Sequence, residues 1–532
     1  MPRTPTAAAL RGARTTIVCL ALLAALAPVA SAGEPVASNA AAARLRPATP
    51  QLIDDAESSG RIAHADATLY RAWALIRPDA VPSEFVSTTP WDGTLAMLQV
   101  RAELARIPAA RMTSALRDAA ERIDTTCPGS TGSLPNTKST NHFYLKYRSA
   151  AIAGGLTIGQ YAAALETTWK TEIGTFGWAR PPKDPVNTPP GGRYLVRLDA
   201  LGSGLYGYVT GTYYAGNNPA TGWNDKDSVA SCMVLNQDFT GFPSGPTDSL
   251  RATVAHEFNH SIQFGYGALT GFGNVKDVFV EGGASWMEDE VFDGADDNYY
   301  YLWPTFTEPM AQYEPSFPYP YWVVFRAMTE RYGTGVKGGG ENVMQFFWEQ
   351  LSKGTSTNLA AMGKAFKHEG TTLGKAYHDA AIALRFNVDC SVTKPKWCLE
   401  EGPNYVALAG ANTSTAPSVA TIGDPAYSGR VFNDYALDWI VVPENQGLFN
   451  LTVNATTGGG KLRTSVVCRA GSLVTTLAPT QVAAGSTNAA FTALDPTGCD
   501  AVVVVITNEN QTGASPSGTS NANYTLKTTP SI

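Results

Sequence analysis

The chain has 532 residues, of which 44% are hydrophobic and 16% charged, and its formal net charge is -7. This length allows two or three domains, and the hydrophobic content excludes a mostly disordered protein. The mild charge, without a basic block or an aromatic-basic stripe, argues against nucleic acid as a partner. The 50 glycines and 34 prolines favour a loop-rich globular protein with much β structure.

The first 32 residues have the pattern of an export signal. Three arginines precede a short apolar run at 17–27, and the small residues at 30–32 resemble a cleavage site. The apolar run is shorter than the roughly 20 residues that a membrane span needs, and no later segment is longer. We therefore expect a secreted, extracellular protein without an integral membrane segment, with a mature chain that starts near Gly33.

Six cysteines follow the expected signal. An even number in an exported chain favours three disulfides. Proximity along the sequence favours Cys390–Cys398 and Cys468–Cys499, which leaves Cys127 for Cys232. A thiolate of Cys127 that caps a metal is the alternative for that residue. No CxxC pair occurs, which argues against a zinc site built from cysteines.

Residues 33–135 are expected to be helical. The stretches 63–76 and 93–123 carry apolar residues at helical spacing, and a turn-forming linker follows from residue 127. Two interpretations of this region stay open, namely a pro-region that is removed and a helical subdomain that remains.

The next region, 136–405, alternates between strand and helix patterns. Strands are expected at 143–147, 193–198 and 231–236, with a glycine-rich loop before the last one, and helices at 160–174, 248–265, 320–332 and 343–352. This order predicts an α+β domain whose second half is helical.

The last region, 406–532, has only strand patterns. Apolar and polar residues alternate at 435–441 and 449–454, and 502–507 is an apolar run typical of a buried strand. Short turn-rich connections predict an all-β sandwich. We find no catalytic group in it, so surface attachment, substrate attachment and simple stabilisation all stay open.

The helix at 248–265 carries the clearest chemical motif. Asp248 or Thr247 is expected to cap its start, and Gly265 to end it. His256 and His260 are four residues apart, so both imidazoles project from one face, as a shared metal ion requires.

The pattern His-Glu-x-x-His predicts a catalytic zinc site. Two imidazoles bind the metal, while Glu257 acts as general base on a water that zinc activates. Glu281, which opens the segment Glu-Gly-Gly-Ala, is the expected third ligand, and two histidines with one carboxylate leave a coordination position open.

These motifs resemble the gluzincin class of metallopeptidases, whose third ligand is a glutamate on a downstream helix. The sequence at 255–260 and 281–289 is closest to that of secreted metalloproteases of myxobacteria and their relatives, and the likeness covers roughly residues 60–390. The resemblance implies a zincin-like catalytic domain with a mixed-sheet lobe, a helical lobe and a cleft between them.

One position departs from the pattern of some gluzincins. They place an aspartate four residues after the ligand glutamate to orient a zinc histidine, and here that position is Ser285. Glu288 or Asp289 is the expected substitute. Tyr319 and Tyr321 are the candidates for stabilising the oxyanion.

We therefore predict a secreted zinc metalloendopeptidase that acts on protein or peptide substrates, with its oligomeric state left open. The alternatives are a secreted binding or adhesion protein with a vestigial or structural zinc site, and a zinc hydrolase that acts on other substrates. An acidic loop with Asp293, Asp296 and Asp297 could bind Ca²⁺, although its spacing fits no EF-hand and a solvated turn is favoured.

Overall fold

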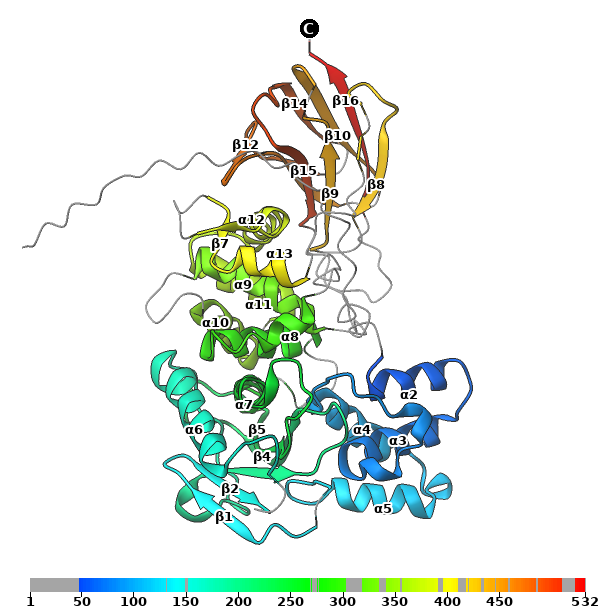
Figure 1. Ribbon diagram of the computed structural model, residues 1–532, viewed down its shortest axis with the longest axis vertical. Coiled ribbons are helices and arrows are strands. Elements are labelled where there is room, and N and C mark those ends of the chain that lie inside the picture. The colour runs from blue at the N-terminus through cyan, green and yellow to red at the C-terminus, as the bar shows by residue number, and fades with distance from the viewer. Residues whose placement is uncertain are drawn as a thin grey trace, which may run out of the picture.

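The computed structural model describes residues 47–130, 132–148, 152–267, 269, 275, 277–302, 318–333, 341–354, 356–390, 396–409, 418–419, 421–431, 435–444, 446–457, 460–484, 487–509 and 522–531. The expected export signal lies outside the described residues. Helices and sheets are mixed up to about residue 409, and a β-rich region follows (Figure 1). The α+β prediction is therefore confirmed. None of the described helices is both long and apolar enough to cross a membrane.

Four helices form the N-terminal region: α2 (Thr49–Ser58), α3 (His64–Ile76), α4 (Thr94–Arg106) and α5 (Ser114–Ile123). Helix α3 confirms the prediction at 63–76. The prediction of one helical stretch over 93–123 is wrong in its middle, where Ile107 is extended and precedes Pro108. Proline disfavours helical backbone at the preceding residue, so α4 ends there and α5 starts anew with Thr113 as its cap.

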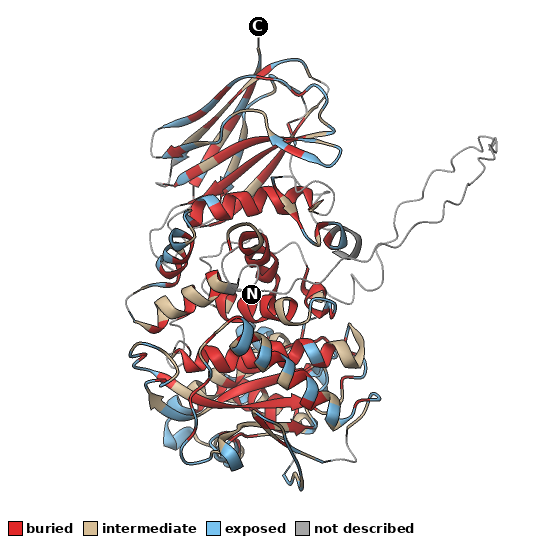
Figure 2. Ribbon diagram, turned by 90° about the vertical axis from the view of Figure 1, so that its left-hand side faces the viewer, coloured by how far each residue is buried: buried red, intermediate tan, exposed pale blue. Residues whose placement is uncertain are grey.

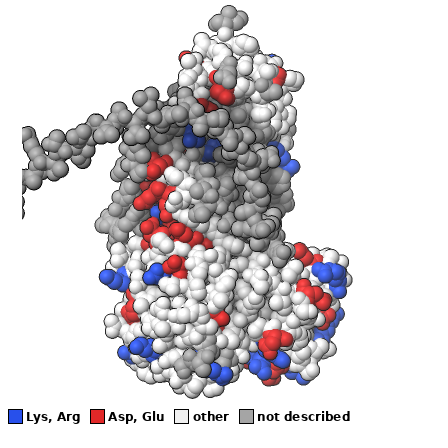
Figure 3. Space-filling model, viewed as in Figure 1, with Lys and Arg blue, Asp and Glu red and all other residues white. Residues whose placement is uncertain are grey.

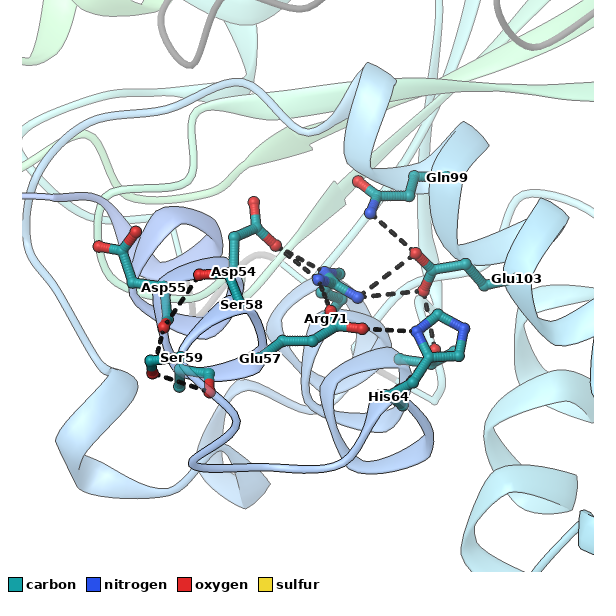
Figure 4. A network of polar contacts seen from close by, with 11 residues as sticks. Asp54, Asp55, Glu57, Ser58, Ser59, His64, Arg71, Gln99 and Glu103 are labelled. Atoms are coloured by element: carbon teal, nitrogen blue, oxygen red, sulfur yellow. Dashed lines mark hydrogen bonds and ion pairs between the residues drawn. The ribbon is translucent and has the colours of Figure 1, made fainter.

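A buried guanidinium ties three of these helices together (Figure 4). Arg71 of α3 is only 5% exposed and pairs with Asp54 and Glu57 of α2 and with Glu103 of α4. A buried charge needs such partners, because an unpaired one is costly in the interior. The apolar faces of the same helices share a core with one side of the neighbouring sheet.

The central sheet has the strand order β1-β2-β3-β5-β4, with β1 (Asn136–Ser139), β2 (Phe143–Tyr147), β3 (Tyr194–Asp199), β4 (Gly207–Gly216) and β5 (Ser228–Asn236). Strands β2, β3 and β5 are parallel, and the edge strand β4 is antiparallel to β5. Helix α6 (Ile158–Trp169) begins at a capping box of Thr157 and Gln160 and continues into a π-helical turn.

The prediction of a glycine-rich loop before β5 is wrong for the segment that forms β4. Its glycines weaken the local strand preference, but pairing with β5 holds the segment in extended form through two irregular steps in register. The consequence is an edge strand beside the helix that carries the histidines.

The helical half consists of α7 (Gly245–Gly265), α8 (Asp277–Val291), α9 (Trp322–Tyr332), α10 (Glu341–Ser352), α11 (Asn358–His368), α12 (Leu373–Phe386) and α13 (Gly402–Ala409), with a short ladder of β6 (Val388–Asp389) and β7 (Cys398–Leu399). Helix α7 lies between the sheet and α8 (Figure 1). The predicted cap is wrong: α7 has Ser244 at its N-cap position, three or four residues earlier, and Asp248 instead accepts a hydrogen bond from Arg251 within the first turns. Its end at Gly265 is confirmed.

The C-terminal region is a sandwich of two antiparallel sheets. One has the order β14-β10-β16-β8 and the other β12-β11-β15-β9, with β13 paired to β11. The bounds are β8 (Tyr427–Val431), β9 (Leu437–Val442), β10 (Phe449–Thr457), β11 (Lys461–Ala470), β12 (Leu473–Thr476), β13 (Gln481–Ala484), β14 (Asn488–Leu494), β15 (Ala501–Asn508) and β16 (Ala522–Pro530). Both sheets contribute to one apolar core, as the alternating patterns predict.

The sandwich shares a second core with the helical half. Val502 and Val504 of β15 face the inside of the sandwich, whereas Val503 and Val505 face the other way and join the core of the helices. Helix α12 packs on β15 there, and buried residues continue across this junction (Figure 2). The imidazole of His378 on α12 contacts the hydroxyls of Thr507 and Ser465 on the sandwich.

The three expected disulfides are all formed, as Cys127–Cys232, Cys390–Cys398 and Cys468–Cys499. The alternative of a metal-capping thiolate at Cys127 is therefore wrong. The first bridge ties the end of the N-terminal helical region to β5. Three disulfides are consistent with an exported protein, because such bonds persist in oxidising surroundings.

Candidate metal centre

Helix α7 presents both histidines on one face, as its sequence predicts. The rings of His256 and His260 have their centroids 4.7 Å apart, and both side chains are buried. The opposite side of the helix carries Leu250, Val254, Phe258 and Ile262, which are buried in the main core. Because this stripe fixes how α7 is rotated, the imidazoles point away from the apolar core.

Glu281 of α8 meets the two histidines. Its Oε2 lies 3.1 Å from Nε2 of His256 and 3.4 Å from Nε2 of His260. Ligand atoms bound about 2.0–2.1 Å from one tetrahedral metal ion lie roughly 3.4 Å apart, so these separations suit a shared ion. His256, His260 and Glu281 are accordingly a buried group that could hold a metal.

Gly282 lets α8 approach the helix behind it. A Cβ atom at this position would lie 3.0 Å from Cβ of Tyr321 and 3.3 Å from the ring of Phe325. A larger residue would therefore push α8, and Glu281 with it, away from α9.

Each histidine is held from its other ring nitrogen. Nδ1 of His256 lies 2.7 Å from Oε1 of Glu288, and Nδ1 of His260 lies 2.9 Å from Oε1 of Gln263. Such contacts leave each Nε2 directed at the metal position and fix the ring orientation. Of the two predicted substitutes for the aspartate of other gluzincins, Glu288 is the one that contacts a histidine. Asp289 pairs with Arg326 instead. The sequence analysis missed Gln263, although it lies three residues after His260 on the same helix.

Several buried atoms at this centre have no hydrogen-bond partner among the described residues. They are Nε2 of His260, Oε1 of Glu281 and Oε1 of Glu257. Unsatisfied buried polar atoms are rare and costly, and those of His260 and Glu281, two members of the group that could hold a metal, fit a bound metal ion. Burial would raise the pKa of Glu281, but the neighbouring His260 and His256 outweigh it and lower that pKa to about 2. This carboxylate is therefore anionic, as a ligand must be.

Glu257 is held off the histidine–glutamate group by a residue of the N-terminal region. Its Oε2 accepts a hydrogen bond of 2.8 Å from the hydroxyl of Thr94, and that hydroxyl in turn accepts one from the amide of Val209 on β4. Burial raises the pKa of Glu257 to about 8, against the opposing effect of His260 and His256.

A second residue of the N-terminal region also reaches the centre. Oδ2 of Asp92 lies 3.9 Å from Nε2 of His256, and Asp92, His256 and Glu257 form a second buried group that could hold a metal. Sequence reasoning missed Asp92 and Thr94, because they lie more than about 160 residues before the histidines and belong to no motif. Only their tertiary position reveals them.

The two tyrosine candidates have different surroundings. The ring of Tyr319 lies 6.2 Å from that of His256, and its hydroxyl lies 3.3 Å from the amide nitrogen of Asp92. Tyr321 instead packs beside Gly282 of α8 and interacts with Tyr377. Tyr319 is thus the candidate with a described contact to a histidine of the centre.

The acidic loop does not form a metal-binding group within the described residues. Asp297 is buried and accepts hydrogen bonds from the hydroxyl of Ser249 and the amide of Ser244, while Asp296 is largely exposed. Acidic side chains gather at mid-height on the face shown in Figure 3. The described groups that could hold a metal contain none of Asp293, Asp296 and Asp297, so Ca²⁺ gains no support.

Comparison with known proteins gives no family. No family model matches this chain, and no curated protein does. A solved structure described as "Crystal structure of Yersinia pseudotuberculosis-derived mitogen (YPM)" aligns with 20% of this chain and 84% of its own, at 12% identity and a TM-score of 0.15. This likeness is too weak to bear on fold or function.

Proposed function

We propose that this protein is a secreted zinc metalloendopeptidase of the gluzincin type, which hydrolyses peptide bonds of extracellular proteins. The observation that carries the proposal is the convergence of His256, His260 and Glu281 in separations that suit one metal ion, with Glu257 beside them. The sheet and the helical half would then correspond to the two lobes of a zincin-like domain.

Each residue of the centre would have a separate role in hydrolysis. A zinc ion on the two histidines and Glu281 would polarise the substrate carbonyl and acidify a water molecule. Glu257 takes a proton from the attacking water and later gives it to the leaving amine. Tyr319, whose ring lies beside that of His256, would stabilise the negative charge on the carbonyl oxygen with its hydroxyl. Glu288 and Gln263 keep the imidazoles oriented throughout.

The second candidate is a secreted binding or adhesion protein with a structural metal site. It is favoured by the burial of the two histidines and Glu281, which are at most 1% exposed. Against it is Glu257, a buried carboxylate that binds no histidine and that a structural site would not need.

A digestion experiment tests the proposal. Purified protein, before and after a limited trypsin treatment that is then blocked with a serine-protease inhibitor, is incubated with casein, and bound zinc is measured. We expect the wild type to cleave after treatment, and both Glu257→Ala and chelated wild type to be inert, the variant with its zinc retained. The exposed Glu121→Ala serves as the matched control and should cleave like wild type. Inert wild type that still binds zinc would overturn the peptidase proposal.

A further inference from the structure

The segment 90–94 of the N-terminal region pairs with residues 204–207, which lead into the edge strand β4 beside the metal centre. The amide of Trp91 donates to the carbonyl of Gly204, the amide of Tyr206 donates to the carbonyl of Trp91, and the amide of Gly93 donates to the carbonyl of Gly207. The approach is so close that a side chain at Gly204 would overlap the carbonyl oxygen of Thr89.

This edge is the natural place for an extended substrate. The other side of β4 is paired with β5, and unpaired strand edges commonly bind extended peptides through backbone hydrogen bonds. At Gly207 an added Cβ would lie 3.4 Å from Cγ of Glu257, so this part of the edge adjoins the general base. The segment 90–94 therefore occupies the position that the scissile peptide needs.

The side chain of Asp92 borders the metal centre, in one buried group with His256 and Glu257. Its Oδ2 lies 3.9 Å from the same Nε2 of His256 that contacts Glu281. The hydroxyl of Tyr301 lies 3.4 Å from this oxygen, and that of Tyr319 lies 3.3 Å from the backbone nitrogen of Asp92. A carboxylate at this point competes with water for the coordination position that a catalytic zinc site must keep open.

Thr94, two residues after Asp92, contacts the expected general base Glu257. Thr94 donates its hydroxyl hydrogen to Glu257 and receives one from the amide of Val209, so both partners of the hydroxyl are fixed. One short segment thus brings the carboxylate of Asp92 beside His256 and occupies one oxygen of the base with Thr94.

The layout of the chain allows this segment to be released. Arg71 holds α2, α3 and α4 as one unit, whereas the bridge Cys127–Cys232 fastens the end of the region to the sheet. A cut after Cys127 would therefore leave the segment tethered. The connection between α4 and α5 offers exposed sites before that bridge, among them Arg106 and Arg111.

We propose that Asp92 is a fourth, displaceable ligand of the metal, and that segment 90–94 keeps the full chain latent until cleavage between α4 and α5 releases it. This inference rests on the proposed function and makes residues up to about 106 an inhibitory pro-region. The sequence leaves open whether this region is a pro-region that is removed or a helical subdomain that remains, and this inference favours the pro-region.

Cobalt substitution tests the ligand assignment without relying on turnover. Full-chain wild type, Asp92→Ala, Asp92→Asn and the exposed control Asp79→Ala are loaded with Co²⁺, and the visible spectrum is followed during azide titration. We expect azide to change the spectrum of both Asp92 variants at concentrations at least about tenfold lower than for wild type and control, because the anion enters the vacated position. Circular dichroism verifies that each variant is folded.

Equal azide responses in wild type and both variants would overturn the assignment, as would loss of Co²⁺ binding in folded Asp92→Asn. Casein digestion by the uncut proteins separates this inference from the proposed function. If the Asp92 variants cleave without trypsin treatment, both stand. If azide binds them selectively but no form of the protein cleaves, the ligand assignment stands and the peptidase proposal fails.

Discussion

Replacement of Glu288 is expected to weaken metal binding while sparing the fold. Glu288 contacts Nδ1 of His256 at 2.7 Å, and both side chains are buried. Loss of a partner that orients a metal-binding histidine typically costs about 10–100-fold in affinity, or roughly 1.4–2.8 kcal/mol. Glu288→Gln keeps an acceptor oxygen and should lie near the lower figure, whereas Glu288→Ala should lie near the upper one.

In the metal-free protein, Glu288→Gln should not lower the thermal stability. Burial raises the pKa of Glu288 to about 7, despite its hydrogen bond with His256, so the surroundings disfavour the ionised carboxylate. A neutral glutamine should therefore leave the melting temperature of the metal-free protein unchanged or higher. Competition with a fluorescent zinc chelator measures the affinity, and thermal unfolding in excess chelator measures the stability.

Zinc affinity within twofold of wild type for both Glu288 variants would refute the role of this carboxylate. A fall in affinity that is matched by an equal fall in metal-free stability would refute it as well, because the defect would then lie in folding.

Two further predictions concern the fold. Replacing Cys127 and Cys232 together by serine opens a link across 105 residues, which should lower the free energy of unfolding by about 2–5 kcal/mol in urea titrations; an unchanged midpoint would contradict this. Burial lowers the pKa of His378 to about 3. The unfolded chain therefore binds more protons than the folded one below pH 6.5. The free energy of unfolding should fall by on the order of 4–5 kcal/mol as pH drops from 6.5 to 3. His378→Leu should flatten this slope, and an equally steep slope in the variant would exclude His378 as its source.

Sequence patterns predicted the parts of the site that lie on one continuous element. His256, Glu257 and His260 share α7, and Glu281 and Glu288 share α8, so helical periodicity placed them correctly relative to their own helix. The pairing of the cysteines was also predictable, because proximity in sequence matched proximity in space.

What the sequence did not reveal depends on contacts between distant segments. Strand β4 is stabilised by β5 rather than by its own glycine-rich residues. Asp92 and Thr94 have no local signal, since only the packing of the N-terminal helices on the sheet brings them to Glu257. Positions in such contacts follow from tertiary structure and not from spacing or propensity.

The most direct test of the metal centre is the zinc content of purified variants, measured by atomic spectrometry after dialysis. We predict one zinc ion per chain in wild type and in Glu257→Gln, and less than about a tenth of that in folded His256→Ala, His260→Ala and Glu281→Ala, because each lacks one of three ligands. Zinc that stays bound in all three folded ligand variants, or wild type that binds none, would contradict the account.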